Sequence, residues 1–262
     1  MAAATMPFTR RGLGKGPVLV FLHGWPDTDD VFEAQYSAFK ETHVMYGLLL
    51  PGYGGDRGQR PPRFTGFTLE EVCEMFIRAV QSIKKDHGGE TVDLIAHDWG
   101  CVISWMALAK EPNLVRRFVA LDIGAHTAPN LKEKLMIVAY QWTLVVFFFL
   151  PSALGSPLTR AVARLFKAPH PQRAHSAMNY LYVSLWAKIL TGKFKNRFQP
   201  PEIPVLYLYG RDKPFFFHSQ RFLDHVNAQP LGGAVGLPGG HWFFAKKSSN
   251  EANQRILRFL SQ

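Results

Sequence analysis

Short apolar runs recur along the chain, and stretches with helical spacing separate them. The runs are rich in β-branched and aromatic residues, which favours buried strands, and they cover residues 17–22, 44–50, 91–96, 114–122, 205–209 and 234–237. Apolar residues three and four positions apart predict helices near 28–42, 68–83, 102–109, 219–226 and 250–260. Strands that alternate with helices form parallel units, so the sequence predicts an α/β fold around a doubly wound sheet.

The alternation stops between residues 126 and 200, where no clear strand is found and the pattern is helical. Helical pieces are expected at 131–150, 157–166 and 171–190. Helices inserted into an α/β alternation predict a cap over the strand ends. We therefore expect a core in two parts, 1–125 and 201–262, with a helical cap at 126–200.

The first cap helix is nearly all apolar from Leu135 to Leu150, apart from Tyr140, Gln141 and Thr143. It is shorter than the roughly 20 residues that a membrane span needs. A buried cap helix is the favoured interpretation. An interfacial helix stays open because Lys132 and Lys134 precede the apolar run, and a membrane span is the least favoured.

Composition narrows the class of protein. A chain of 262 residues with 47% hydrophobic residues can bury one large core. The net charge of +10 is scattered along the chain and accompanies no nucleic-acid motif, so we expect no nucleic-acid partner. An anionic membrane surface is the favoured explanation of the positive charge. Two cysteines make no disulfide framework, and residues 1–7 lack a signal-peptide core. These features predict a cytoplasmic protein, with peripheral membrane contact left open.

The segment from Leu94 to Cys101 carries the strongest chemical signal. An apolar strand ends at Ala96, Asp98 stands at the apex of a sharp turn, and Gly100 opens a helix. The common form of such an elbow is G-x-S-x-G. A carboxylate at the apex can attack an electrophilic carbon and form an ester. An aspartate is also a good helix N-cap, so the pattern alone leaves a purely structural role open.

Other polar residues follow the remaining strands. The motif at 23–27, His-Gly-Trp-Pro-Asp, follows the first strand, and its Trp25–Pro26 bond is a candidate cis peptide. Asp122 follows the fourth strand, Asp212 the fifth, and His241 sits in a Gly-Gly-His-Trp loop after the last. The order of nucleophile, acid and histidine is that of the α/β-hydrolase fold.

Together with the motifs at 23–27, 97–100 and 240–242, this order resembles the aspartate-nucleophile branch of that fold, the epoxide hydrolases and haloalkane dehalogenases. The resemblance implies that Asp98 is the nucleophile and that His241 is the base that activates water. It implies that the backbone N–H groups of Trp25 and Trp99 stabilise the oxyanion. Because the mechanism needs only side chains and water, no cofactor and no metal are expected.

The acid that orients His241 is open between two residues. Asp212 is preferred because it follows the strand before the last, although the Gly-Arg-Asp turn is one residue shorter than the family's usual spacing. Asp122 is the alternative, at a position that some dehalogenases use. His23, at the start of the first motif, is assigned to the substrate site.

Epoxide opening also needs an acid, which cap tyrosines usually supply in the family. Tyr140 comes early in the cap, while Tyr182 is the preferred late donor and Tyr180 its alternative. The run Phe147–Phe149 predicts an apolar small-molecule substrate, such as a lipid or aryl epoxide. The expected function is hydrolysis of an epoxide to a diol through an aspartyl ester. The alternatives are a haloalkane dehalogenase and a catalytically weak lipid-binding protein of the same fold, and the oligomeric state stays unknown.

The chain departs from the family at its start. The family usually places two more strands before the first strand predicted here. We therefore expect a mostly parallel sheet trimmed to about six strands at its N-terminal edge, with the helical cap inserted after the sixth-strand position of the family. Such trimming would leave an edge for a partner chain or a lipid surface to cover.

Overall fold

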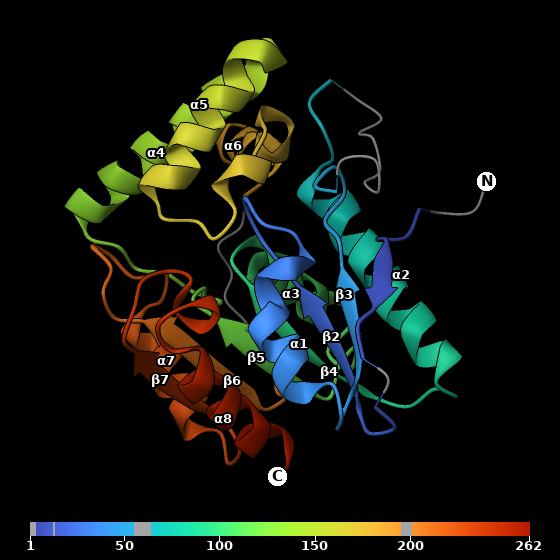
Figure 1. Cartoon of the computed structure of the whole chain (residues 1–262). Coiled ribbons are helices and arrows are strands. Elements are labelled where there is room, and N and C mark those ends of the chain that lie inside the picture. Colours follow the sequence, from blue (N-terminus) through green and yellow to red (C-terminus); the bar gives the residue numbers. More distant parts are fainter. Residues whose placement is uncertain (1–3, 13, 55–63, 195–200) are drawn as a thin grey trace.

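The computed structural model describes residues 4–12, 14–54, 64–194 and 201–262 (Figure 1). The described residues form one seven-stranded sheet in the order β1-β3-β2-β4-β5-β6-β7. The strands are β1 (Phe8–Arg10), β2 (Val18–Leu22), β3 (Val44–Leu48), β4 (Val92–His97), β5 (Arg117–Leu121), β6 (Val205–Gly210) and β7 (Gly233–Leu237). All pairs from β3 to β7 are parallel, which confirms the predicted doubly wound sheet.

The count of about six strands was wrong, because β1 adds an antiparallel edge strand to β3. This strand pairs Phe8 with Leu48 and Arg10 with Tyr46. It is three residues long, and two of its three side chains are exposed, so it shows no apolar run. Its place in the sheet depends on main-chain pairing to β3, which a pattern of side chains does not reveal.

Helices cover both faces of the sheet, as the alternation predicts. The core helices are α1 (Glu33–Phe39), α2 (Leu69–Asp86), α3 (Trp99–Lys110), α7 (Gln220–Ala228) and α8 (Ser249–Leu260). Figure 1 shows α1 beside α8, whereas α2 packs against α3. The long helix α2 begins at a capping box in which Thr68 and Glu71 satisfy each other's backbone N–H groups. The helix expected at 28–42 is shorter, because a 3-10 turn at Asp29–Phe32 precedes α1.

The segment predicted as the cap, called the cap from here on, contains α4 (Leu131–Phe149), α5 (Ser152–Leu165) and α6 (Tyr180–Leu190), which lie together beside one end of the sheet (Figure 1). Short 3-10 turns at Pro171–Arg173 and Ser176–Asn179 replace the first part of the helix expected at 171–190. The expected cap boundary at residue 200 lies outside the described residues. Within residues 126–194 every regular element is a helix or a 3-10 turn, and these are joined by short irregular stretches.

Helix α4 is not the buried helix that the sequence favours. Among its 19 residues only Leu144 and Val145 are buried, and Leu131 is 74% exposed. In the described part of the chain, no helix combines the length and the apolar character that crossing a membrane requires. The helix is therefore a surface element whose apolar residues point both inward and outward.

Candidate active site

Asp98 stands at the sharp turn between β4 and α3. Its backbone has φ 54° and ψ −124°, a region that residues other than glycine rarely adopt. Two glycines allow this turn to approach β2 and the loop after it. A Cβ on Gly100 would lie 2.2 Å from the carbonyl oxygen of Leu22, and one on Gly24 would lie 2.3 Å from Asp98 Oδ1. The motif at residues 23–27 therefore lies in close contact with the Asp98 carboxylate.

Both oxygens of Asp98 have defined partners. The Trp25 backbone N–H donates to Oδ1 at 2.7 Å, and His241 Nε2 lies 3.2 Å from Oδ2. Burial would raise the pKa of Asp98, but the hydrogen bonds from His241 and from the Trp99 backbone N–H outweigh it and lower the pKa below its usual range. The carboxylate is therefore ionised at neutral pH. The backbone N–H groups of Trp25 and Trp99 both point at it, as the resemblance implies.

His241 lies between two carboxylates. Its Nδ1–H donates to Asp122 Oδ2 at 2.5 Å, while its Nε2 faces Asp98. Burial would lower the pKa of His241, but Asp122 and Asp98 raise it to about 9. The imidazole is therefore protonated at neutral pH and bridges the two acids. Such an arrangement holds the ring with Nε2 directed at the carboxylate of the elbow.

Asp122, rather than the preferred Asp212, lies beside His241. It follows β5 directly and is fully buried. Besides His241, it accepts a hydrogen bond from the Gly210 N–H at 3.0 Å and one from Lys213 Nζ at 2.6 Å. Burial would raise the pKa of Asp122, but Lys213 and His241 lower it below its usual range. The carboxylate therefore stays charged under the imidazole.

Asp212 has a different set of partners, which corrects the sequence-based preference. It accepts a hydrogen bond from the Gly239 N–H at 2.9 Å and lies 3.8 Å from Lys247 Nζ. Its side chain is 58% exposed. The short turn after β6 is the physical reason, because it brings Asp212 to the loop that precedes His241 and not to the imidazole. Lys213, the next residue, reaches into the site instead.

Two of the three candidate tyrosines line the cavities beside Asp98. Tyr140 on α4 and Tyr182 on α6 face each other with ring centroids 6.2 Å apart, and Tyr182 also packs on Trp99 at 5.1 Å. Tyr180 does not belong to this group, since its ring packs on Tyr53 and its hydroxyl has no hydrogen-bond partner among the described residues. Residues two apart on a helix point about 200° apart, so Tyr180 and Tyr182 cannot face the same cavity.

His23 is also outside the cavity, which corrects its assignment to the substrate site. It is fully buried and accepts a hydrogen bond from the Leu50 N–H at 3.1 Å through Nε2. Its Nδ1 lies 3.0 Å from the Gly24 carbonyl oxygen. Burial lowers its pKa to about 4, so the ring is neutral. His23 therefore connects the loops after β2 and β3, and the Trp25–Pro26 bond that follows it is cis.

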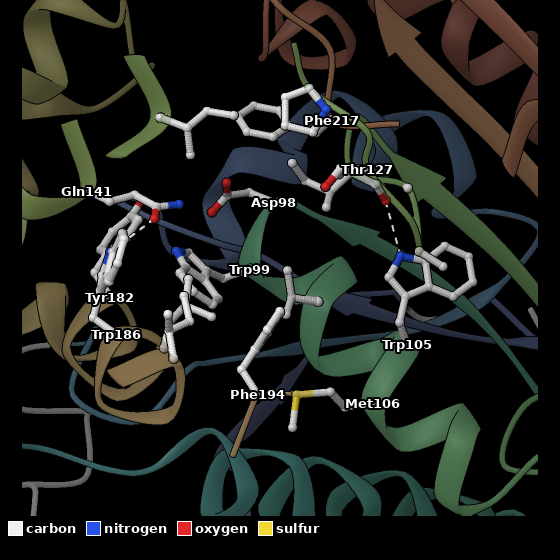
Figure 2. Close-up of a pocket in the computed structure, with 18 of the residues that line it drawn as sticks. Asp98, Trp99, Trp105, Met106, Thr127, Gln141, Tyr182, Trp186, Phe194 and Phe217 are labelled. Carbon is white, nitrogen blue, oxygen red and sulfur yellow. Dashed lines mark hydrogen bonds between the residues drawn. The ribbon is translucent and has the colours of Figure 1, made fainter. Parts of the chain in front are cut away.

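Two cavities meet at Asp98. One has a volume of about 930 Å³ and the other about 740 Å³, and both are lined by Asp98, Tyr140, Tyr182 and Phe217. In the larger cavity, Figure 2 shows the Asp98 carboxylate between Gln141 and Tyr182 on one side and Thr127 and Phe217 on the other. The walls of both are mostly apolar. The arrangement fits a long apolar molecule whose reactive carbon lies near its middle.

Three side chains that support the site were not among the predicted residues. Gln141 donates to the Tyr140 hydroxyl at 3.5 Å and accepts from Trp186 Nε1 at 3.1 Å. Asn179 accepts from Trp25 Nε1 at 2.8 Å, which links the cap to the first motif. Lys213 donates a hydrogen bond to the Asp122 carboxylate. The one available signal was polarity, because Gln141 interrupts the apolar run of α4.

Comparisons with known proteins identify the family of the chain. The family model of the alpha/beta hydrolase fold matches residues 17–247. The chain is 24% identical over 281 aligned positions to epoxide hydrolase 3 of Mus musculus, covering 97% of this chain and 73% of that protein. It is 26% identical over 118 residues to epoxide hydrolase 2 of Caenorhabditis elegans, covering 45% of this chain but only 32% of that protein.

A solved structure shows the same fold. The epoxide hydrolase of Bacillus megaterium, crystallised with an inhibitor, superimposes with a TM-score of 0.73 at 18% identity, covering 98% of this chain and 97% of that one. The match to several curated relatives spans only about a third of their length, so their names alone do not fix the activity of this chain. With a family model that matches most of its length, the chain belongs to the α/β-hydrolase fold family.

Proposed function

We propose that this protein hydrolyses epoxides to diols through an ester on Asp98. The observation that carries the proposal is the row Asp98–His241–Asp122 at the meeting point of two apolar cavities, with Tyr140 and Tyr182 on the cap side. In the first step an Asp98 oxygen attacks one epoxide carbon from behind. The carbon–oxygen bond of the ring breaks, and the departing oxygen takes a proton from a tyrosine hydroxyl.

The second step hydrolyses the ester. Once Asp98 is an ester it carries no charge, so one of the two carboxylates that hold the His241 proton is lost and the pKa of the imidazole falls. The proton that His241 loses passes through solvent to the tyrosinate left by the first step. Neutral His241 then takes a proton from water, and the resulting hydroxide attacks the ester carbonyl carbon. The N–H groups of Trp25 and Trp99 stabilise the oxyanion. As the oxyanion collapses, the bond to the diol oxygen breaks and that oxygen takes the carboxyl proton, which leaves the diol and the Asp98 carboxylate beside protonated His241.

The shape of the site supports an internal epoxide as the substrate. Both cavities include Asp98 in their walls, and each is large enough to take an apolar substituent. An epoxide with one apolar group on each carbon fills both cavities while its ring faces the carboxylate. The proposal predicts a higher kcat/KM for internal aliphatic or aryl epoxides than for small terminal ones. Turnover restricted to small polar epoxides would contradict it.

The ester is tested by a single turnover in heavy-oxygen water. The ester mechanism places heavy oxygen in the Asp98 carboxylate, because water attacks the carbonyl carbon and one of the two oxygens stays behind. Peptide mass spectrometry detects the label. In the His241→Ala variant the expected result is trapped alkyl ester on Asp98 without label. Diol formation with no label in Asp98 would mean direct attack by water and would overturn the proposal.

Haloalkane dehalogenation is the second candidate, and the position of the acid supports it. Some dehalogenases place this acid where Asp122 stands, after the strand that follows the nucleophile elbow. The two tyrosines favour the epoxide, because a halide leaves without needing a proton. Halide release from a panel of haloalkanes, measured beside epoxide turnover, distinguishes the two. Release of halide with no diol from any epoxide would replace the first proposal by the second.

A further inference from the structure

The cap carries an apolar stripe on its outer surface. Six residues of α4 that lie three or four positions apart share one exposed face, and they are Leu131, Leu135, Val138, Trp142, Val146 and Phe149. Their spacing puts them on one side of the helix along its whole length. On α5, Leu154 and Leu165 are exposed as well, Leu165 by 75%. An outward apolar stripe of this length is unusual for a helix in water and marks an interaction surface.

The same region holds most of the net positive charge of the protein. Between residues 126 and 194 the sequence has eight lysines and arginines and one acid, Glu133. Within the described residues, six of the eight have no acidic partner, and these are Lys132, Lys134, Arg160, Arg164, Lys167 and Lys193. Several border exposed apolar side chains, since Lys132 follows Leu131 and Arg164 precedes Leu165. The partner that this surface fits is therefore both apolar and anionic.

The inner side of α4 belongs to the cavities. Ile137, Tyr140 and Gln141 line the larger one, and Met136 lines the smaller one. Val138, at the edge of the stripe, also reaches the larger cavity. Met136 is at the same time partly exposed, as are Leu165 at the end of α5 and Phe166 just after it, which also line the smaller cavity. An apolar path therefore leads from the outer face of the cap to Asp98. A single helix separates the exposed stripe from the site.

We propose that the α4–α5 face of the cap docks on an anionic lipid bilayer. Helix α4 lies in the plane of the interface, with its stripe among the acyl chains and its lysines at the headgroups. The docking does not depend on the reaction, so it holds whether or not the proposed function does. If that function holds, the mouth at Met136, Leu165 and Phe166 takes an apolar epoxide directly from the membrane.

The apolar part of the proposal is tested by vesicle flotation without substrate. The probes are phosphatidylcholine vesicles with and without about a third phosphatidylserine. We expect the protein to float with the anionic vesicles. The double variant Leu135→Gln with Val146→Gln should bind them at least about tenfold more weakly. Leu231→Gln is the matched control, because Leu231 is an exposed leucine between α7 and β7, far from the cap in the chain. None of these three residues lines a cavity.

The charged part is tested by Lys132→Glu with Arg164→Glu. Each basic residue near an anionic surface changes binding by about fivefold, so the loss should exceed tenfold and should grow smaller as salt is added. Lys40→Glu is the control, since Lys40 is an exposed lysine at the end of α1. Unchanged melting temperatures of the variants show that the fold is intact.

Three results would overturn the proposal. The first is equal flotation of the wild type and of the Leu135 and Val146 variant. The second is equal binding to neutral and anionic vesicles. The third is no flotation, together with a dimer in sedimentation that the same variant dissociates, because the stripe would then be a contact between two copies of the chain. Since no turnover is measured, a failure of the proposed reaction leaves these results unchanged.

Discussion

The core and the cap of this protein hold their functional groups in different ways. In the core, Asp98, Asp122 and His241 follow parallel strands, and backbone N–H groups, glycine contacts and charged hydrogen bonds fix each of them. In the cap, Tyr140 and Tyr182 are placed by ring packing, a long hydrogen bond between Gln141 and Tyr140 and a hydrogen bond between Trp99 and Tyr182, on helices that are half exposed. We infer that substitutions in the core lower the rates of the chemical steps by large factors, and that substitutions in the cap lower them by smaller ones.

The largest effect is expected for Asp98→Asn. An amide has almost the same shape and can keep the hydrogen bond from the Trp25 N–H, but it is a very poor nucleophile. We predict a loss of kcat/KM of about 10⁴-fold or more, with a melting temperature close to that of the wild type. Diol formation is measured by chromatography on freshly prepared protein. Activity within tenfold of the wild type would exclude Asp98 as nucleophile and remove the contrast between core and cap.

The next prediction compares two aspartates of the core. Asp122→Asn should lower kcat by about 10²- to 10⁴-fold, because the imidazole loses the charge that orients it and raises its pKa. Asp212→Asn should stay within about a factor of two, because Asp212 is exposed and its carboxylate has Gly239 and Lys247 as polar partners among the described residues. The two variants are matched in chemistry and differ only in place. A larger loss for Asp212→Asn would restore the sequence-based preference.

This pair of aspartates also shows which parts of the site can be predicted from the sequence and which cannot. The strand ends that carry Asp98 and His241 were predictable, because a buried run followed by a polar residue and glycine has a clear pattern. The choice between Asp122 and Asp212 was not, since it depends on the path of a turn that is one residue short. The sequence favoured a buried α4 over an exposed one for a related reason. An apolar run does not say whether its residues meet a core or solvent, and here they meet both.

The positions of the helix ends also decide which side chains reach the site, and the sequence does not give them accurately. The sequence places a helix from 171 to 190, whereas α6 begins at Tyr180 after two 3-10 turns. The phase of a helix decides which side chain faces inward, so the choice between Tyr180 and Tyr182 needs the actual packing. His23 shows the limit for motifs. Its position beside Trp25 suggested a role in the site, but its ring is used to connect two loops.

The ion pairs of the core predict a pH dependence of stability. The folded pKa of His241, about 9, lies above its ordinary value of 6.5. Its contribution to the free energy of unfolding is therefore fully present below pH 6.5 and is lost as the pH rises through 9. The lowered pKa values of Asp98 and Asp122 act at the other end, where stability falls as these carboxylates are protonated in acid.

Urea unfolding between pH 6 and 10 measures the loss, which we expect to be of order 1–3 kcal/mol. His241→Gln should lack this part of the profile, and the difference between the two proteins isolates it from other groups that titrate above pH 9. Parallel profiles for the two proteins would show that the imidazole is not held by the carboxylates, and the core would then be no more tightly coupled than the cap.

The smallest effects are expected in the cap. Tyr140→Phe and Tyr182→Phe each remove one proton donor and leave the other, so each should lower kcat by about tenfold, and the double variant should lose more than the product of the two. Tyr180→Phe is the matched control, because its hydroxyl is buried without a partner among the described residues and its removal costs no hydrogen bond. If Tyr140→Phe and Tyr182→Phe were no more damaging than Tyr180→Phe, the cap tyrosines would act through packing alone. The epoxide oxygen would then need its proton from another group, and the cap would contribute shape to the site without contributing chemistry.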